Sequence, residues 1–116
     1  MKNTGKINYI ELPCTNLKAS KTFFTDAFGW SFVDYGPKYS AIQGAGLDGG
    51  FYESEHVAST KNGSALVVIY SDNLEATLAT VIDCGGKLEQ DIFSFPGGRR
   101  FHFSDPSGNE YAVWSE

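Results

Sequence analysis

The chain has 116 residues, 41% of them hydrophobic and 20% charged, which fits one folded domain with a single core. Its net charge of −5 and its lone adjacent basic pair, Arg99-Arg100, exclude a nucleic-acid-binding face. The first residues lack a signal-peptide core, and no apolar run approaches the roughly 20 residues of a membrane span, so we expect a cytoplasmic protein with no membrane partner.

An internal repeat organises the sequence. The segment Asn16-Leu17-Lys18-Ala19-Ser20 returns as Asn73-Leu74-Glu75-Ala76-Thr77, 57 positions later. In both copies an apolar run precedes the Asn and an amphipathic stretch follows it. Such a period predicts two copies of one supersecondary unit.

The first copy begins with a strand predicted at residues 7–12 and ended by Pro13, in which Tyr9 and Glu11 share a face. Asn16 is predicted to cap a helix that ends at Gly29. Short runs separated by Gly-Pro and Gly-Ala-Gly then predict strands at 31–35, 39–44 and 47–53.

The second copy follows a polar linker at residues 54–64. It predicts a strand at 65–71 and a helix that Asn73 caps and Gly85-Gly86 ends. Three further strands are predicted at 87–95, 99–104 and 110–115. We therefore predict an α+β fold in one domain, residues 1–116, with βαβββ modules at about 7–53 and 65–115. The modules are expected to form a half-open, eight-stranded barrel-like sheet around a cavity, with the helices outside.

Several motifs carry a resemblance. They are Asn16-Leu17 with Ala19-Ser20, Phe23-Phe24, Phe28-Gly29-Trp30, Asp72-Asn73-Leu74, Cys84-Gly85-Gly86 and Asp105-Pro106-Ser107-Gly108-Asn109. With them the chain resembles, over nearly its whole length, the vicinal-oxygen-chelate superfamily of glyoxalases, bleomycin-resistance proteins and extradiol dioxygenases. The resemblance implies paired βαβββ modules, a cavity between them and commonly a homodimer. The turn at 105–109, its most specific mark, is expected to be structural, with Gly108 and Asn109 able to take positive φ.

Metal-binding members of this family carry ligands at strand positions that correspond here to Tyr9, Leu66 and Ala112. A divalent metal needs three or four converging His or carboxylate groups, and these residue types do not supply them. The only histidines, His56 and His102, lie at other positions. We therefore predict no metal and no cofactor.

Strand alternation places a candidate ligand-binding set on the inward faces. From the first strands of the copies and from the last strand, it contains Tyr9, Glu11, Leu66, Val68, Tyr70, Glu110, Ala112 and Trp114, and from the strand at 99–104 it contains Arg100 and His102. The aromatic rings could instead fill the space between the sheets, and Arg100 and His102 could lie on a solvated edge. Glu11 is the best catalytic candidate, and we expect Arg100 or His102 to pair with it.

Three functions fit these patterns. The first is a metal-free small-molecule-binding protein whose cavity takes a cationic or aromatic ligand. The second is a glyoxalase-like lyase or isomerase with Glu11 as general base, which requires burial to raise the pKa of a carboxyl group. The third is an accessory or regulatory module that binds a partner chain. In each case we expect a homodimer, because an open half-barrel exposes a concave sheet and strand edges.

Overall fold

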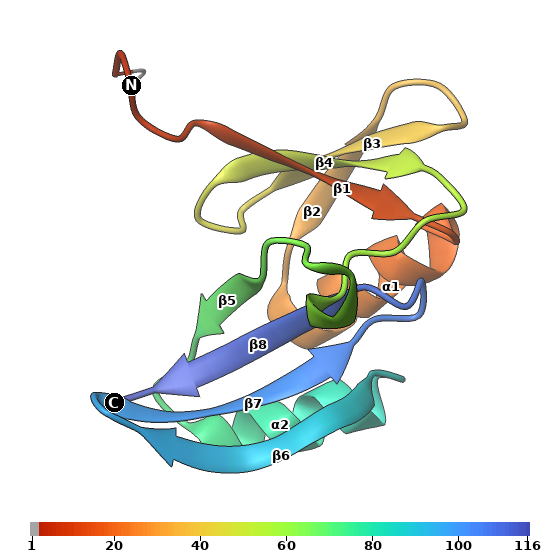
Figure 1. The fold of residues 1–116 in the computed structure, drawn as a ribbon. Helices are drawn as coiled ribbons and strands as arrows, with labels where there is room; N and C mark the ends of the chain where they lie inside the picture. The colour runs from red at the N-terminus through yellow and green to blue at the C-terminus, as the bar shows by residue number, and fades with distance from the viewer. Residues whose placement is uncertain (1–2) are drawn as a thin grey trace.

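The computed structural model describes residues 3–116 and contains two βαβββ modules, each with one four-stranded sheet and one helix (Figure 1). In the N-terminal module the elements are β1 (Tyr9–Cys14), α1 (Leu17–Phe28), β2 (Ser31–Asp34), β3 (Tyr39–Gln43) and β4 (Asp48–Glu53). After a 3₁₀ turn, η1 (Thr60–Asn62), the C-terminal module has β5 (Val67–Tyr70), α2 (Leu74–Asp83), β6 (Lys87–Phe95), β7 (Gly98–Ser104) and β8 (Glu110–Ser115). The predicted α+β fold and its repeated module are confirmed.

The two sheets have the same topology. Their strand orders are β1-β4-β3-β2 and β5-β8-β7-β6, and in each the first strand of the module runs parallel to the last. The eight strands are thus divided between two sheets rather than joined in one, and β1 and β5 are both edge strands. The arrangement is half-open, as predicted.

Both helices begin at the predicted asparagines. The side chains of Asn16 and Asn73 accept the N–H groups of Ala19 and Ala76, each at 3.1 Å. The two helix ends differ, because α1 ends at Gly29 with φ of 73° while Cys84 caps α2. The α2 helix is therefore two residues shorter than its counterpart, 10 against 12.

The predicted bounds of β1 are wrong: the strand begins at Tyr9 rather than at residue 7, and it does not end before Pro13 but continues to Cys14. Pro13 lies opposite Tyr52 of β4, and within residues 3–116 no strand pairs with the other side of β1. Because β1 is an edge strand, the missing N–H of a proline need not remove a ladder hydrogen bond. Leu66 also differs from prediction, since it precedes β5 rather than lying in it.

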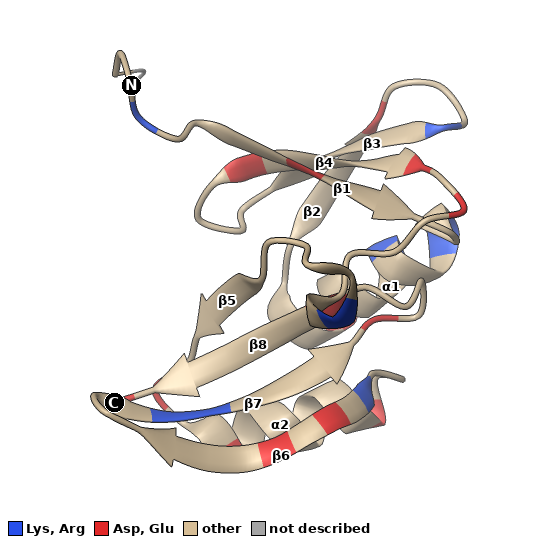
Figure 2. Cartoon of the chain, viewed as in Figure 1, with Lys and Arg blue, Asp and Glu red and all other residues tan. Residues whose placement is uncertain are grey.

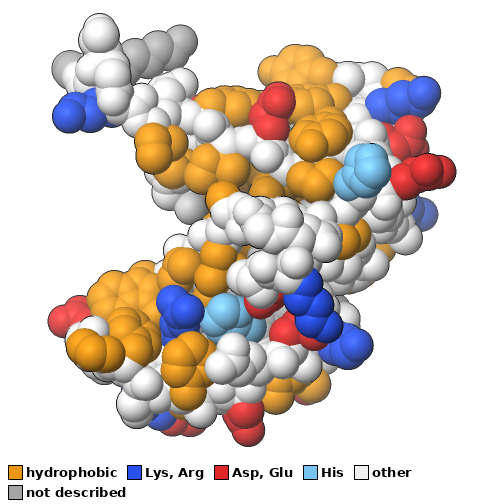
Figure 3. Space-filling view, in the orientation of Figure 1, with side chains coloured by type: hydrophobic (Ala, Val, Ile, Leu, Met, Phe, Trp, Pro, Cys, Tyr) orange, Lys and Arg blue, Asp and Glu red, His pale blue; other side chains and the backbone are white. Residues whose placement is uncertain are grey.

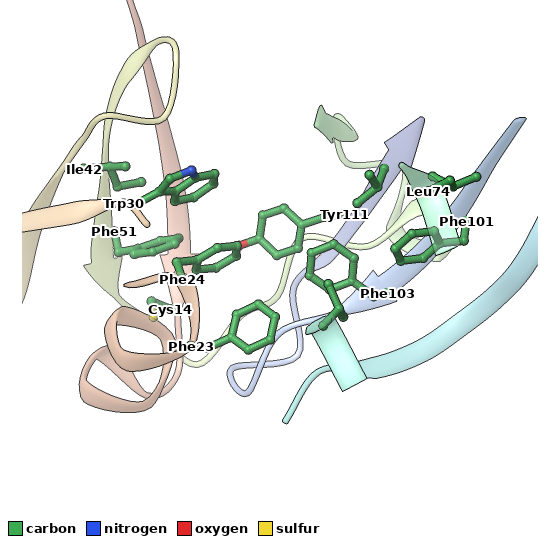
Figure 4. Packing of buried hydrophobic residues seen from close by; sticks show 12 residues of the cluster. Cys14, Phe23, Phe24, Trp30, Ile42, Phe51, Leu74, Phe101, Phe103 and Tyr111 are labelled. Carbon is green, nitrogen blue, oxygen red and sulfur yellow. The ribbon is translucent and has the colours of Figure 1, made fainter. Parts of the chain in front are cut away.

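A single aromatic core joins the modules (Figure 4). Phe24 of α1 stacks on Trp30 at 4.4 Å between ring centroids and meets Tyr111 of β8 edge-on at 5.0 Å. Phe23, its neighbour on α1, lies 5.8 Å from Phe103 of β7. The helix of the N-terminal module thus packs on strands of the C-terminal module, and much of the aromatic content serves this core.

The turn at residues 105–109 links the modules through a buried carboxylate. Asp105 Oδ1 accepts the backbone N–H groups of Ser107 and Asn109, both at 3.0 Å. Its Oδ2 accepts the hydroxyls of Tyr111, at 3.0 Å, and of Ser20 on α1, at 3.2 Å. Burial raises the pKa of the Asp105 carboxyl above its ordinary value, although all four donors act to lower it.

Asn109 extends the same link to the linker and to β1. It is fully buried; its Oδ1 accepts the N–H of Ala58 at 2.8 Å, and its Nδ2 donates to the Pro13 carbonyl at 2.6 Å. The predicted structural role of the turn fits these contacts, and Gly108 does take a positive φ of 93°. The expectation of a positive φ at Asn109 is wrong, since only glycines among residues 3–116 have one.

Candidate functional site

Each sheet packs one face on the core and leaves the other open. Figure 3 shows hydrophobic side chains gathered over both halves of the molecule. On the open faces Tyr70 is 50% exposed, and Tyr9 and Val68 are each 44% exposed. Contiguous exposed apolar surface of this kind marks binding sites more often than chance. We call the surface that contains Tyr9 the N-terminal open face, and the surface that contains Val68 and Tyr70 the C-terminal open face.

The C-terminal open face carries a cluster of four aromatic side chains and one arginine, built from four strands. Tyr70 of β5 meets Trp114 of β8 edge-on at 5.2 Å, and Phe95 of β6 lies 6.4 Å from the same indole. The guanidinium of Arg100 on β7 lies 5.3 Å from the centroid of Phe93 and 5.6 Å from that of Phe95. We call these five residues the aromatic shelf. In Figure 2 the basic segment of β7 lies between β6 and β8, and the basic residue that begins β6 lies at the other end of β7, opposite Ser104.

A histidine–carboxylate pair lies beside the shelf. His102 Nδ1 is 2.7 Å from Glu110 Oε2, and the two side chains are only 6% and 13% exposed. Glu110 Oε1 accepts both the N–H and the hydroxyl of Thr60, at 2.9 and 2.8 Å. Burial acts to raise the pKa of Glu110, but the hydrogen bonds from His102 and Thr60 outweigh it, and the pKa lies below its ordinary value.

This pair determines where the proton of the imidazole lies. An ionised carboxylate only accepts hydrogen bonds, so His102 Nδ1 carries a hydrogen and donates it to Glu110. The opposite ring nitrogen, Nε2, is buried and has no partner among the described residues. Arg100 Nε, two residues away on the same strand, is also buried and has no hydrogen-bond partner in the described part of the chain.

Glu11 lies on the N-terminal open face, but its neighbours are not the ones expected from the sequence. Glu11 Oε2 accepts the hydroxyl of Tyr39 at 3.0 Å, and that hydroxyl is 2.5 Å from the hydroxyl of Tyr9. Burial, followed by the contacts with Tyr9 and Glu11, raises the pKa of Tyr39 above its ordinary value. The expected pairing of Glu11 with Arg100 or His102 is wrong, because both residues lie on the other sheet, where His102 pairs with Glu110 and the guanidinium of Arg100 lies near the ring of Phe93.

Between the sheet edges runs a groove of 1120 Å³. It is lined by β1 and β5, including Leu12 and Ile69, and Glu11, Asp48 and His56 are among its polar residues. Four of the predicted ligand-binding residues line the groove: Glu11, Leu66, Val68 and Tyr70. The others do not line it: Tyr9, Arg100, His102, Glu110, Ala112 and Trp114. Ala112 is fully buried beneath the C-terminal open face. The groove therefore encloses only part of the predicted set, and Tyr70 connects the groove to the shelf.

The residues present do not fit the metal site that the family resemblance implies. The corresponding positions hold a tyrosine, a leucine and a buried alanine. Within residues 3–116 no three His, Cys, Asp or Glu side chains come together in a group that could hold a metal ion. We therefore assign no step to a metal.

Four residues that contribute to these surfaces were not predicted from the sequence. They are Tyr39, Phe93, Phe95 and Thr60. Phe93 and Phe95 lie in a predicted strand, and alternation along it placed them on one face, so a signal existed for them. Thr60 had none, because it reaches Glu110 from an irregular linker.

The chain is a two-module α+β protein, with paired βαβββ modules, a shared core and open aromatic faces. The sequence profile described as the Glyoxalase/Bleomycin resistance protein/Dioxygenase superfamily matches residues 6–113, and the chain belongs to this superfamily. No helix of residues 3–116 is long and apolar enough to cross a membrane.

Known relatives agree with this assignment. A glyoxylase-like domain-containing protein of Didymella fabae is 32% identical over 94% of the chain and 92% of that protein. A protein of Mycobacterium bovis named as a putative glyoxylase, CFP32, is 25% identical, and the chain spans 45% of its length. The crystal structure of a glyoxalase-related enzyme from Fulvimarina pelagi has the same fold, with a TM-score of 0.79 at 19% identity over 97% of this chain and 88% of that one.

Proposed function

We propose that the chain is a metal-free small-molecule-binding protein of the glyoxalase and bleomycin-resistance type, which holds an aromatic ligand on its C-terminal open face. The observation that carries the proposal is the aromatic shelf, where Tyr70 is half exposed beside Trp114. Rings arranged edge-on offer both faces and edges to another ring. Of the two ligand classes expected from the sequence, cationic and aromatic, the shelf supports the aromatic one.

The test compares two exposed tyrosines. Tyr70 belongs to the shelf, whereas Tyr35, 67% exposed, follows β2 in the other module. Small aromatic compounds that raise the melting temperature of the wild type should bind Tyr70→Ser about 2–10-fold more weakly, because one aromatic contact is lost. Tyr35→Ser should bind like the wild type. Equal binding by both variants would contradict the proposed location.

A second candidate function is a lyase or isomerase that moves a proton. The His102–Glu110 pair favours it, since a carboxylate that orients an imidazole leaves the opposite nitrogen to act as a base. Glu11, the base expected from the sequence, is exposed and so lacks the burial that this role requires. If this candidate is correct, a substrate found by screening should be turned over by Glu11→Gln and not by His102→Gln, with binding retained by both. Loss of turnover in Glu11→Gln alone would restore the original assignment.

We also propose that the chain is a cytoplasmic homodimer in which a second copy covers part of the open faces. The support is the exposed apolar side chains of the faces and of the groove between them, where Ile7 is 76%, Leu47 43% and Tyr52 40% exposed. A partner of another sequence, as in an accessory or regulatory module, is the alternative. Light scattering at several concentrations separates the two, because only a homodimer doubles the mass of 12.7 kDa in the purified protein.

A further inference from the structure

The two consecutive arginines of β7 lie in different surroundings. Alternation sends Arg99 and Arg100 to opposite faces of the strand. Arg99 forms a two-pronged ion pair with Glu75 of α2, with nitrogen–oxygen distances of 2.6 and 3.2 Å. No carboxylate of residues 3–116 lies within ion-pair distance of Arg100. The C-terminal open face therefore carries a cation that has no ion-pair partner in the described part of the chain.

The surroundings of Arg100 hold it in place without neutralising it. Its guanidinium lies close to the rings of Phe93 and Phe95, which attract a cation through their π electrons. Its Nε and the Nε2 of neighbouring His102 are the buried side-chain polar atoms without a partner in residues 3–116. Buried polar atoms are nearly always hydrogen-bonded in native proteins, so two exceptions two residues apart on one face call for an explanation.

We propose that Arg100 anchors the acidic group of an aromatic carboxylate whose ring lies against Tyr70 and Trp114. This inference rests on the proposed function and names the ligand class of the same face. A guanidinium is a planar fork of N–H donors that matches the two oxygens of a carboxylate. Trp114 lies directly opposite Arg100 in the β7–β8 register and Tyr70 opposite Trp114 in the β5–β8 register, so a ligand held by Arg100 meets aromatic rings along one row of the sheet.

His102 supplies a second polar contact to this ligand. Its imidazole lies 5.9 Å from the ring of Phe93, on the same side of the sheet as Arg100. Because His102 Nδ1 faces Glu110, Nε2 is the ring nitrogen left free to form a hydrogen bond with a polar group of the ligand. The site thus combines one fixed cation, one unpaired imidazole nitrogen and several aromatic rings.

Three probes of the same shape and different charge test the inference. They are 2-naphthoate, 2-naphthamide and 2-naphthylmethylammonium, titrated calorimetrically into the full chain. The wild type should bind the naphthoate about 10–100-fold more tightly than the amide, the range expected for a charge-assisted hydrogen bond. Arg100→Gln should bind both equally, and Arg99→Gln, the matched control on the opposite face, should keep the preference.

Each failure has its own meaning. If the amide or the ammonium binds as tightly as the naphthoate, the acidic ligand is refuted while the aromatic site stands. If none of the three probes binds, both proposals fail. Arg100→Lys guards against misfolding of the Gln variant, because it keeps the charge and loses the planar fork; it should show an intermediate preference. An unchanged preference in Arg100→Lys and Arg100→Gln, both folded by their melting curves, would remove Arg100 from the site.

Discussion

Replacing Asn109 with alanine tests whether the turn at 105–109 links the two modules. The amide of Asn109 bridges two distant parts of the chain, the linker at Ala58 and the end of β1 at Pro13. Alanine removes both hydrogen bonds and supplies no substitute. The N–H of Ala58, a residue only 6% exposed, then has no acceptor in the folded protein.

The structure gives the size of the effect. A buried main-chain group that loses its partner costs about 1–3 kcal/mol, and the partly buried Pro13 carbonyl should lie at the lower end of that range. Together the two losses predict a destabilisation of about 2–4 kcal/mol. At about 4 °C per kcal/mol for a domain of this size, the melting temperature should fall by about 8–16 °C.

Thermal unfolding followed by circular dichroism measures this change. The control is Asn62→Ala in the same linker, because Asn62 is exposed and its side chain makes one long hydrogen bond of 3.4 Å to Val57. That variant should melt within about 2 °C of the wild type. If Asn109→Ala also melts within about 2 °C, the turn is not the link described here. Loss of the single transition, with the modules melting separately, would support it.

Three further predictions follow from the described contacts. Glu11→Gln should melt within about 2 °C of the wild type, because Glu11 is exposed and the hydroxyl of Tyr39 can donate to an amide oxygen; a larger fall would show a structural role for the charge. Burial raises the pKa of Asp105, so the stability that Asp105 contributes relative to the Asp105→Asn variant should be largest below about pH 4 and should decline as the pH rises through the folded-state pKa. Urea unfolding of both proteins at several pH values measures this contribution. A contribution that increases with pH would show that the pKa of Asp105 is lowered instead. Light scattering at tens of micromolar should give twice 12.7 kDa, and a monomer mass would refute the homodimer.

The repeat, the helix caps and most strands could be predicted because their signals are local. An asparagine before an amphipathic run and alternation along a strand each act over a few residues. The end of β1 was predicted wrongly because a proline ends a strand only where both sides of the strand are paired. Whether β1 is an edge strand depends on the order of strands in the sheet, which the local sequence does not show.

The site was harder to predict because its contacts join residues far apart in the sequence. Tyr39 reaches Glu11 across 28 positions, and neither residue's own strand indicates the other. His102 and Glu110 are only eight positions apart, on adjacent strands around the turn at 105–109, so the register of that hairpin could have revealed the pair. The groove depends on how two modules pack as bodies, which strand patterns do not encode.

The most direct test of a ligand site on the C-terminal open face uses the two tryptophans of the chain. Trp114 belongs to the aromatic shelf, whereas Trp30 is 9% exposed and stacked on Phe24 in the core. Their indole N–H groups give two separate signals in a ¹H–¹⁵N spectrum, which Trp114→Phe assigns. On titration with 2-naphthoate, the Trp114 signal should shift progressively to saturation while the Trp30 signal stays in place. A Trp114 signal that does not move while 2-naphthoate binds elsewhere, or a shift confined to Trp30, would contradict a ligand site on this face.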